Sequence, residues 1–443
     1  MAKHTLLSFF TLAAIAIAGV PASAGTLSLE EAVNIALQSN PEIRTEQREV
    51  DARDREVRQA LAGYYPTLDL VAAYGFQERD PVVGRNPFTG ELPAGRTRNE
   101  LDRSEVQLNL RQLVFDGFRT QSEHRNQKAR LKSAQHRTYS VAEDVSLRVV
   151  QAYIDVLNRQ QILDVAKESL AFHEDVYQRM EKRFDSGAGS KADLSQISGR
   201  LALAKTNLVT ASNNLLDSRI NFQRVVGRFP EEGELVTPGS YASALSGSVE
   251  EAVSRAVNNH PLLKTAEADV EAVSATYKQT KSAFLPSLHI EAQRDWNDNI
   301  NGVEGRIDDT QVLLRLRYNI FNGQADVARK QQFAYLVEQA REIRNNARRA
   351  VEEELRLAWS SREALAQQLP ALKTHMEDSL STRDSYTQQF DLGRRTLLDL
   401  LNTENEYIDA RIAYQQAWHQ VLFSEYRIFR ATGDLLGTLG AQL

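Results

Sequence analysis

Hydrophobic and polar residues alternate in four segments of the chain. Two lie at about residues 66–77 and 105–115, and two at about 286–297 and 309–321. In the first segment one set of alternate positions is apolar or aromatic throughout: Leu68, Leu70, Ala72, Tyr74 and Phe76. A period of two indicates a β-strand, because successive side chains point to opposite faces. Each segment has roughly the ten residues that a tilted strand needs to cross a membrane.

Charged residues occupy the other face of these predicted strands. They are Asp69, Glu291, Arg315 and Arg317. An antiparallel sheet over a soluble core would explain the alternation alone. Ionised side chains are costly in a dry core but are solvated in a water-filled lumen. The pattern therefore favours strands of a transmembrane β-barrel.

A helical period follows the second and the fourth strand over two long stretches. They run from about residue 119 to 185 and from about residue 324 to 391, without glycine and with Pro370 as the one proline. Apolar residues recur there at steps of three and four, as in coiled coils. At 1.5 Å per residue, about 67 residues span on the order of 100 Å. A glycine-containing turn and a return helix follow each stretch, which predicts two helical hairpins, at 118–226 and 324–431.

The two halves of the chain repeat each other. Leu29-Glu30-Glu31-Ala32-Val33 recurs as Val249-Glu250-Glu251-Ala252-Val253, and Phe115-Asp116-Gly117 recurs as Phe321-Asn322-Gly323. Such self-similarity indicates a duplicated structural unit. The predicted parts are repeat 1 at about 25–227, a linker at about 227–247 and repeat 2 at about 248–443, with opening helices at 28–63 and 248–282.

The first 24 residues have the pattern of a secretory signal peptide. Lys3 and His4 precede an apolar run, and Ala22-Ser23-Ala24 forms a small-residue cleavage site. The mature chain is therefore expected to begin at Gly25 in an exported compartment. No apolar run of 18 or more residues follows, which excludes a multi-span helical membrane protein.

Composition excludes several classes of function. The net charge is −6 with both signs interspersed, so no basic stripe for nucleic acid is present. The absence of cysteine excludes disulfides, thiolate metal sites and a lipidated N-terminal cysteine. The eight histidines lack ligand spacing, and no phosphate-binding loop or nucleophile elbow occurs. We therefore expect no enzyme, no cofactor and no metal site.

Four strands are too few to close a barrel, and an open sheet edge in lipid leaves backbone groups unpaired. If these strands span a membrane, the chain must therefore oligomerise. Twelve strands from three chains would enclose an aqueous pore, and the same symmetry would arrange the helices as a tube. The predicted fold class is mainly α with a small transmembrane β-barrel contribution. A structural coiled-coil or stalk protein of the cell surface is the rival interpretation, but it does not explain the paired strands.

The chain resembles the TolC family of outer membrane factors over nearly its whole mature length. A Phe-x-x-Gly-x-x-[Ser/Thr]-x-x-Asp-Leu motif occurs twice: Phe184, Gly187, Ser190, Asp193 and Leu194, then Phe390, Gly393, Thr396, Asp399 and Leu400. The resemblance implies a homotrimer in the outer-membrane lipid that docks on a periplasmic adaptor protein and an inner-membrane transporter. With no lipidation cysteine and with this N-terminal pattern, the chain looks most similar to the type I protein secretion branch, whose transporter is of the ABC class. Small-molecule efflux is the alternative.

The resemblance also implies roles for residues at the two hairpin turns, which form a periplasmic entrance in this family. Residues that tie the entrance closed correspond to Asp193, Arg395 and Phe390, and a ring of acids corresponds to Asp399 and Asn402. Phe390 lacks the hydroxyl of the family's tyrosine and Asn402 lacks a charge. The closed state is therefore expected to be held differently here.

The exposed turns themselves are candidates for the adaptor contact: Gly187, Ala188, Gly393 and Arg394. A simpler role for the two glycines is to cap the long helices. Asp193 and Arg395 could equally be solvated charges that contribute little. Asp399, repeated three times around a narrow opening, is predicted to make the entrance prefer cations.

Overall fold

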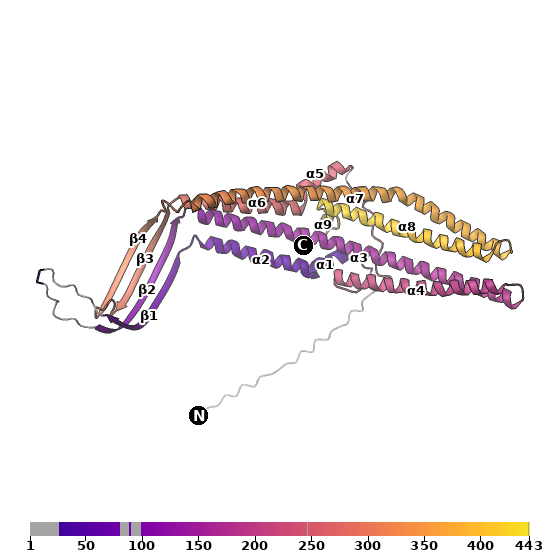
Figure 1. Ribbon diagram of the computed structural model, residues 1–443, viewed down its shortest axis with the longest axis horizontal. Coiled ribbons are helices and arrows are strands. Elements are labelled where there is room, and N and C mark those ends of the chain that lie inside the picture. Colours follow the sequence, from indigo (N-terminus) through magenta and orange to yellow (C-terminus); the bar gives the residue numbers. More distant parts are fainter. Residues whose placement is uncertain (1–25, 80–87, 90–98, 246, 442) are drawn as a thin grey trace, which may run out of the picture.

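The structure is a computed structural model that describes residues 26–79, 88–89, 99–245, 247–441 and 443. The molecule is elongated, with one β-sheet at one end and long helices running away from it (Figure 1). The predicted signal peptide at residues 1–24 lies outside the described residues. The predicted fold class, mainly helical with four antiparallel strands and two long helical hairpins, is confirmed.

The sheet has the order β1-β2-β3-β4, and all its pairs are antiparallel. Its strands are β1 (Thr67–Arg79), β2 (Asn99–Phe115), β3 (Ser287–Asp298) and β4 (Arg306–Arg317). Three predicted strand bounds differ from the observed ones by three residues or more: the start of β2, and both ends of β4, which begins at Arg306 rather than 309. β2 begins before residue 105 because Asn99 to Ser104 pair with the far end of β1. β4 ends at Arg317 rather than 321, because its partner β3 begins at Ser287, which pairs with Arg317.

One face of the sheet is apolar and exposed. Its large side chains are more than half exposed: Leu68, Leu70, Tyr74, Phe76, Val312, Leu314 and Leu316. The register places Asp69, Glu291, Arg315 and Arg317 on the opposite face, because Leu68 pairs with Leu110 whereas Asp69 pairs with Asn109 and Glu291 with Arg111. A sheet whose apolar face meets no protein core is typical of strands in contact with lipid. Among the described helices, none is both long and apolar enough to cross a membrane.

Six helices form the long part of the molecule. They are α2 (Pro41–Ala62), α3 (Arg119–Asp185), α4 (Lys191–Val226), α6 (Pro261–Thr280), α7 (Ala325–Asp391) and α8 (Leu397–Thr432). α3 and α7 each have 67 residues. The shorter helices α2 and α4 pack along successive parts of α3, and α6 and α8 along successive parts of α7 (Figure 1). α6 also contacts α3, so the two repeats share one helical layer.

Short elements pack around the middle of the long helices. They are α1 (Leu29–Ser39), η1 (Ala242–Ala244), α5 (Val249–Asn259) and α9 (Leu435–Thr438), whereas η2 (Lys281–Phe284) connects α6 to β3 at the sheet end. The buried hydroxyl oxygen of Tyr153 on α3 lies 2.7 Å from the backbone oxygens of both Leu27 and Val236, which share its one proton, and it accepts from the backbone nitrogen of Val236 at 2.9 Å. Arg430 of α8 pairs with Asp144 of α3 at 2.6 Å and with Glu354 of α7. These contacts fasten the linker and both repeats to one another at mid-length.

Candidate functional site: the two hairpin tips

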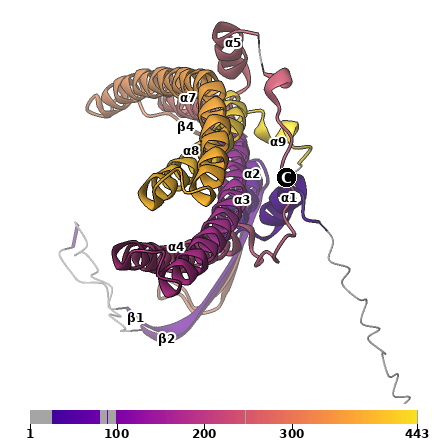
Figure 2. The same ribbon diagram turned by 90° about the vertical axis from the view of Figure 1, so that its right-hand side faces the viewer.

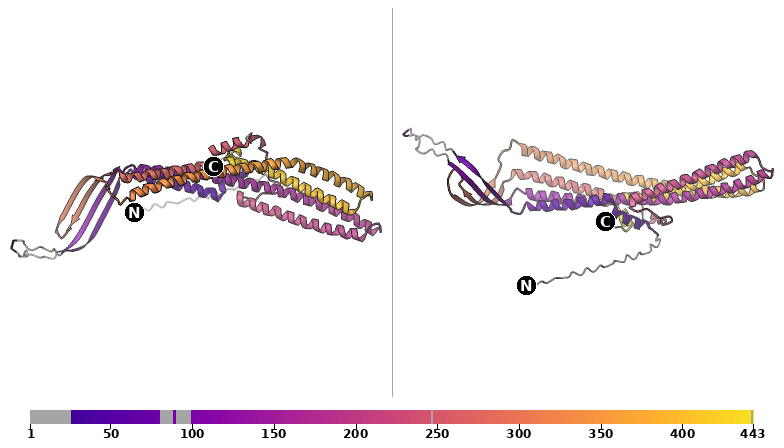
Figure 3. Two further views of the ribbon diagram at one scale, coloured as in Figure 1. Left: turned by 45° about the horizontal axis from the view of Figure 1, so that its top comes forward. Right: turned by 90° about the horizontal axis from the view of Figure 1, so that it is seen from below.

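The turns that join α3 to α4 and α7 to α8 lie next to each other at the end of the molecule opposite the sheet (Figure 3). Figure 2 looks along the molecule from this end. Phe184 and Phe390 are 206 residues apart in sequence (390 − 184), yet both lie in the last turn of a 67-residue helix. The duplication therefore brings both copies of the motif to one place.

Gly187 and Gly393 end the two long helices in a left-handed conformation, with φ of +79° and +72°. The caps use equivalent backbone hydrogen bonds: Gly187 N to Phe184 O at 2.9 Å, Ala188 N to Arg183 O at 2.9 Å, Gly393 N to Phe390 O at 3.0 Å and Arg394 N to Gln389 O at 2.8 Å. Other residues in this conformation cost about 1–2 kcal/mol. Both glycines are therefore capping residues, and the four turn residues proposed for an adaptor contact are exposed.

The two turns differ at one equivalent position, which is Gly189 in the first turn and Arg395 in the second (395 − 189 = 206). A Cβ atom on Gly189 would lie 2.8 Å from the backbone nitrogen of Phe184 and 3.0 Å from the carbonyl carbon of Arg183. The first turn therefore requires glycine there, whereas the second holds a long cationic side chain.

Arg395 and Asp193 are not brought together within one chain. Arg395 donates from Nε to Oε1 of Gln389 at 3.1 Å, and its guanidinium lies 4.2 Å from the ring centroid of Tyr386. Both of these partners belong to its own hairpin. Asp193 forms no ion pair with any of the residues that the structure describes. An ion pair between Asp193 of one chain and Arg395 of a neighbouring chain therefore stays a prediction.

Phe390 lies inside the tip region, not at its surface. It is 3% exposed and belongs to an apolar cluster that joins the two hairpins: Val176, Met180, Ile197, Phe390, Leu397, Leu400 and Leu401. The guanidinium of Arg183 lies 4.8 Å from its ring centroid. The aromatic ring therefore contributes to packing between the hairpins, a role that does not need the missing hydroxyl.

An ion pair that the sequence analysis did not identify also links the tips. Nη1 of Arg179 on α3 lies 2.7 Å from Oδ1 of Asp391 at the end of α7. Both side chains are partly exposed, so we expect a contribution of about 0.5–1 kcal/mol.

Asp399 begins a polar stripe on α8. Its carboxylate accepts hydrogen bonds from the hydroxyl (2.9 Å) and the backbone nitrogen (3.2 Å) of Thr396, which lower the pKa of Asp399. It is therefore ionised at neutral pH. Asn402, Glu406 and Asp409 follow at steps of three, four and three and are exposed, so all four side chains share one helix face. The sequence analysis named only the first two residues of this stripe.

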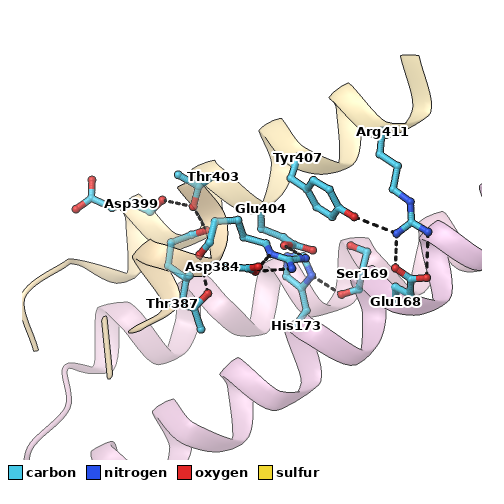
Figure 4. Close-up of polar contacts among 12 residues, drawn as sticks. Glu168, Ser169, His173, Asp384, Thr387, Asp399, Thr403, Glu404, Tyr407 and Arg411 are labelled. Carbon is cyan, nitrogen blue, oxygen red and sulfur yellow. Dashed lines mark hydrogen bonds and ion pairs between the residues drawn. The ribbon is translucent and has the colours of Figure 1, made fainter. Parts of the chain in front are cut away.

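A buried carboxyl group lies on α8 above the tips (Figure 4). Glu404 is 1% exposed, and burial raises its pKa from 4.5 to about 7. Its nearest cationic group is Arg383 of α7, whose Nη1 lies 3.6 Å from Oε2, beyond hydrogen-bond distance. Oε2 has no hydrogen-bond donor among the described residues. The guanidinium carbon of Arg383 also lies over the ring of Tyr407, at 4.5 Å from the ring centroid.

Next to Glu404, Arg411 of α8 reaches Glu168 of α3 with two nitrogens, one of them at 3.1 Å (Figure 4). This hydrogen-bonded pair lowers the pKa of Glu168. His173 of α3 is buried, which lowers the pKa of its imidazole, and Nδ1 lies 2.7 Å from the backbone oxygen of Ser169. The neutral ring therefore donates from Nδ1. Polar contacts thus link the two repeats above the apolar cluster.

Glu404 could have been recognised from the sequence. Leu397, Leu400, Glu404, Tyr407 and Arg411 follow one another at steps of three and four along α8. Charged residues in a row that is otherwise apolar indicate buried polar contacts.

No group of His, Asp or Glu residues in the described parts of the chain is arranged to hold a metal ion.

Comparisons with known proteins agree with this architecture. The family described as "Outer membrane efflux protein" matches residues 32–228 and 252–434, which are the two repeats without most of the linker. The chain is 25% identical over 427 residues to the outer membrane efflux protein BepC of Brucella suis, covering 94% of this chain and 90% of BepC. It is 21% identical over 417 residues to the alkaline protease secretion protein AprF of Pseudomonas aeruginosa, covering 90% and 84%.

Among solved structures, the outer membrane protein VceC of Vibrio cholerae has the same fold. It superposes with a TM-score of 0.74 at 16% identity, covering 91% of this chain and 96% of VceC. The family match covers both repeats, including the four strands and both long hairpins. The chain therefore belongs to the outer membrane efflux protein family, and it is a non-enzymatic, TolC-type channel of the outer membrane whose helices extend into the periplasm.

Proposed function

We propose that three copies of this chain form one channel, which is the exit duct of a type I protein secretion system. In this proposal the hairpin tips receive the substrate from a periplasmic adaptor and an inner-membrane ABC transporter. The observation that carries the trimer is the four-stranded sheet, in which β1 and β4 each pair on one side only within the described residues. Its exposed apolar face requires lipid, and its two open edges require neighbouring strands.

Protein secretion is favoured over efflux by the similarity to AprF, whose name records the secretion of a protease. The absence of a cysteine for lipid attachment agrees with this assignment. Efflux of small molecules is the second candidate, because BepC is named an efflux protein.

Deletion of the gene separates these two functions. For a secretion duct, we expect one or a few proteins to disappear from the culture medium and to return when the gene is restored. Tolerance to dyes, detergents and antibiotics should stay unchanged. Loss of tolerance with an unchanged set of secreted proteins would favour efflux. The purified protein should also require detergent and have the mass of three chains, and a water-soluble monomer would contradict the proposed channel.

We also propose that the exposed turn residues contact the adaptor. Ala188→Trp tests this better than a change at Gly187, because Ala188 is exposed and has an ordinary φ, whereas any side chain at Gly187 strains the backbone. We expect Ala188→Trp to block secretion while the trimer persists on a native gel. Ala171→Trp, an exposed alanine farther along α3, is the matched control and should secrete normally. Loss of the trimer in Ala188→Trp would show a folding defect instead.

A tie between Asp193 and Arg395 of neighbouring chains can be tested by disulfide formation, since the native chain contains no cysteine. The variant with Asp193→Cys and Arg395→Cys should give covalent dimers and trimers after mild oxidation. The two single variants are the controls. A product that remains monomeric on a denaturing gel would count against the tie.

A further inference from the structure

A cavity of about 920 Å³ lies where the strands meet the helices. Its walls come from all four strands, from α3, α7 and η2, and from the ends of α2 and α6. The strand residues that line it include Thr67, Arg111, His289 and Arg317. These positions belong to the face opposite the exposed apolar side chains, since Thr67 pairs with Arg111 and Ser287 with Arg317. The cavity is therefore on the polar face of the sheet.

Four arginines from four different elements line this cavity. They are Arg111 of β2, Arg119 at the start of α3, Arg317 at the end of β4 and Arg329 near the start of α7. The side chains of Arg119, Arg317 and Arg329 form no ion pair and no hydrogen bond with the residues that the structure describes. Among the described residues, Nε of Arg111 lies 3.9 Å from a carboxylate oxygen of Glu291. The other oxygen of this carboxylate accepts from Nε of Arg315 at 2.6 Å. Most of their hydrogen-bond donors are therefore free.

Three carboxylates line the same cavity or its rim, but none of them forms an ion pair with these four arginines, and each accepts hydrogen bonds from neutral donors. Asp116 accepts from the backbone nitrogen and hydroxyl of Thr120, at 2.8 and 2.6 Å. Glu123 accepts from Gln127 at 2.7 Å and from Gln279 at 3.1 Å. Asp326 accepts from Asn322 at 3.3 Å. Within the described residues, the guanidinium groups of Arg119, Arg317 and Arg329 therefore have no carboxylate partner, and the four arginines outnumber the three acids.

We propose that this cavity binds a multivalent oxyanion, of the class of inorganic polyphosphate, on the inner side of the channel. Guanidinium groups match phosphate oxygens with two parallel hydrogen bonds and are more weakly hydrated than ammonium groups. A cavity of this size accommodates a ligand with several phosphate groups. The site itself lies within one chain, but its position inside the channel rests on the proposed trimer. There, three such cavities would form a positive collar at the base of the barrel, at the opposite end of the tube from the acidic Asp399.

Binding of inorganic tripolyphosphate to the purified full-length protein in detergent tests the proposal. Calorimetry at low salt should show binding to the wild-type protein. The variant with Arg317→Gln and Arg329→Gln should bind about tenfold more weakly or worse, because hydrogen bonds from charged donors are lost. The control removes two charges from α7 outside the cavity, Arg341→Gln with Arg349→Gln. It should bind within about twofold of the wild type.

Three results would overturn the proposal: no binding to the wild type, equal affinity in the cavity variant, or an equal loss in the control. Neither Arg317 nor Arg329 has a side-chain partner among the described residues, so folding should be unaffected. A native gel checks that the oligomer persists. The oligomeric state also separates this test from the proposed function. A monomeric protein that still binds tripolyphosphate would refute the channel but not the site, whereas a trimer that does not bind would refute only the site.

Discussion

Replacing Glu404 by glutamine tests how the buried carboxyl group affects folding near the entrance. Glutamine has the shape of the protonated acid but cannot ionise. Burial raises the pKa of Glu404 from 4.5 to about 7, against the opposing effect of Arg383. The folded state therefore binds this proton more tightly than the unfolded state does. Stability from this group is fully present below pH 4.5 and is lost as the pH rises towards 7.

The size of the effect follows from the shift in pKa. A difference of 2.5 units (7 − 4.5) corresponds to about 3 kcal/mol per chain, at 1.36 kcal/mol per unit. The free energy of unfolding of Glu404→Gln relative to the wild type should therefore rise by about that amount between pH 4.5 and pH 8. A constant offset, such as a lost contact with Arg383, cancels in this comparison of two pH values.

The assay is denaturant or thermal unfolding of the purified protein between pH 4.5 and pH 8. Glu143 of α3 is also buried with its pKa raised to about 7, so the wild-type curve alone combines at least two groups. The difference between the curves of the wild type and Glu404→Gln isolates one of them. Glu406→Gln, at an exposed position on the same helix, should follow the wild type at every pH. Parallel curves for the wild type and Glu404→Gln would refute the reasoning.

Three further predictions concern the tips. Asp399→Asn keeps an oxygen that accepts from Thr396 but removes the charge, so the preference of the channel for cations should fall. Reversal potentials in a salt gradient measure this preference, and an unchanged reversal potential would contradict the prediction. Arg179→Gln removes the 2.7 Å ion pair with Asp391 and should raise the conductance of the closed channel in planar bilayers. A conductance equal to that of the wild type would show that this ion pair does not hold the entrance closed. Gly189→Ala should destabilise the protein by about 1–3 kcal/mol, because the added Cβ meets backbone atoms. Gly199→Ala, whose Cβ would meet nothing within 4 Å, is the control, and equal melting temperatures for the two variants would count against a steric requirement.

Local patterns in the sequence determined most of the fold. A period of two predicted four strands, and steps of three and four predicted the hairpins, because each period reports which side of an element is apolar. Gly187 and Gly393 were identified as possible caps for an equally local reason, since a helix that ends in a left-handed residue prefers glycine there. The family resemblance was carried by the repeated motif, which can be read without a structure.

Strand ends, buried positions and ion pairs that depend on a residue distant in the sequence were decided only by the tertiary structure. The end of β4 is set by the first residue of β3, and the buried position of Phe390 is set by the other hairpin. Arg179 and Asp391, which form an ion pair, are 212 residues apart (391 − 179), and Arg119 and Arg329, which share a cavity, are 210 apart (329 − 119). A local period in the sequence does not predict contacts between residues so far apart in the chain, because these contacts form only when the two repeats pack against each other.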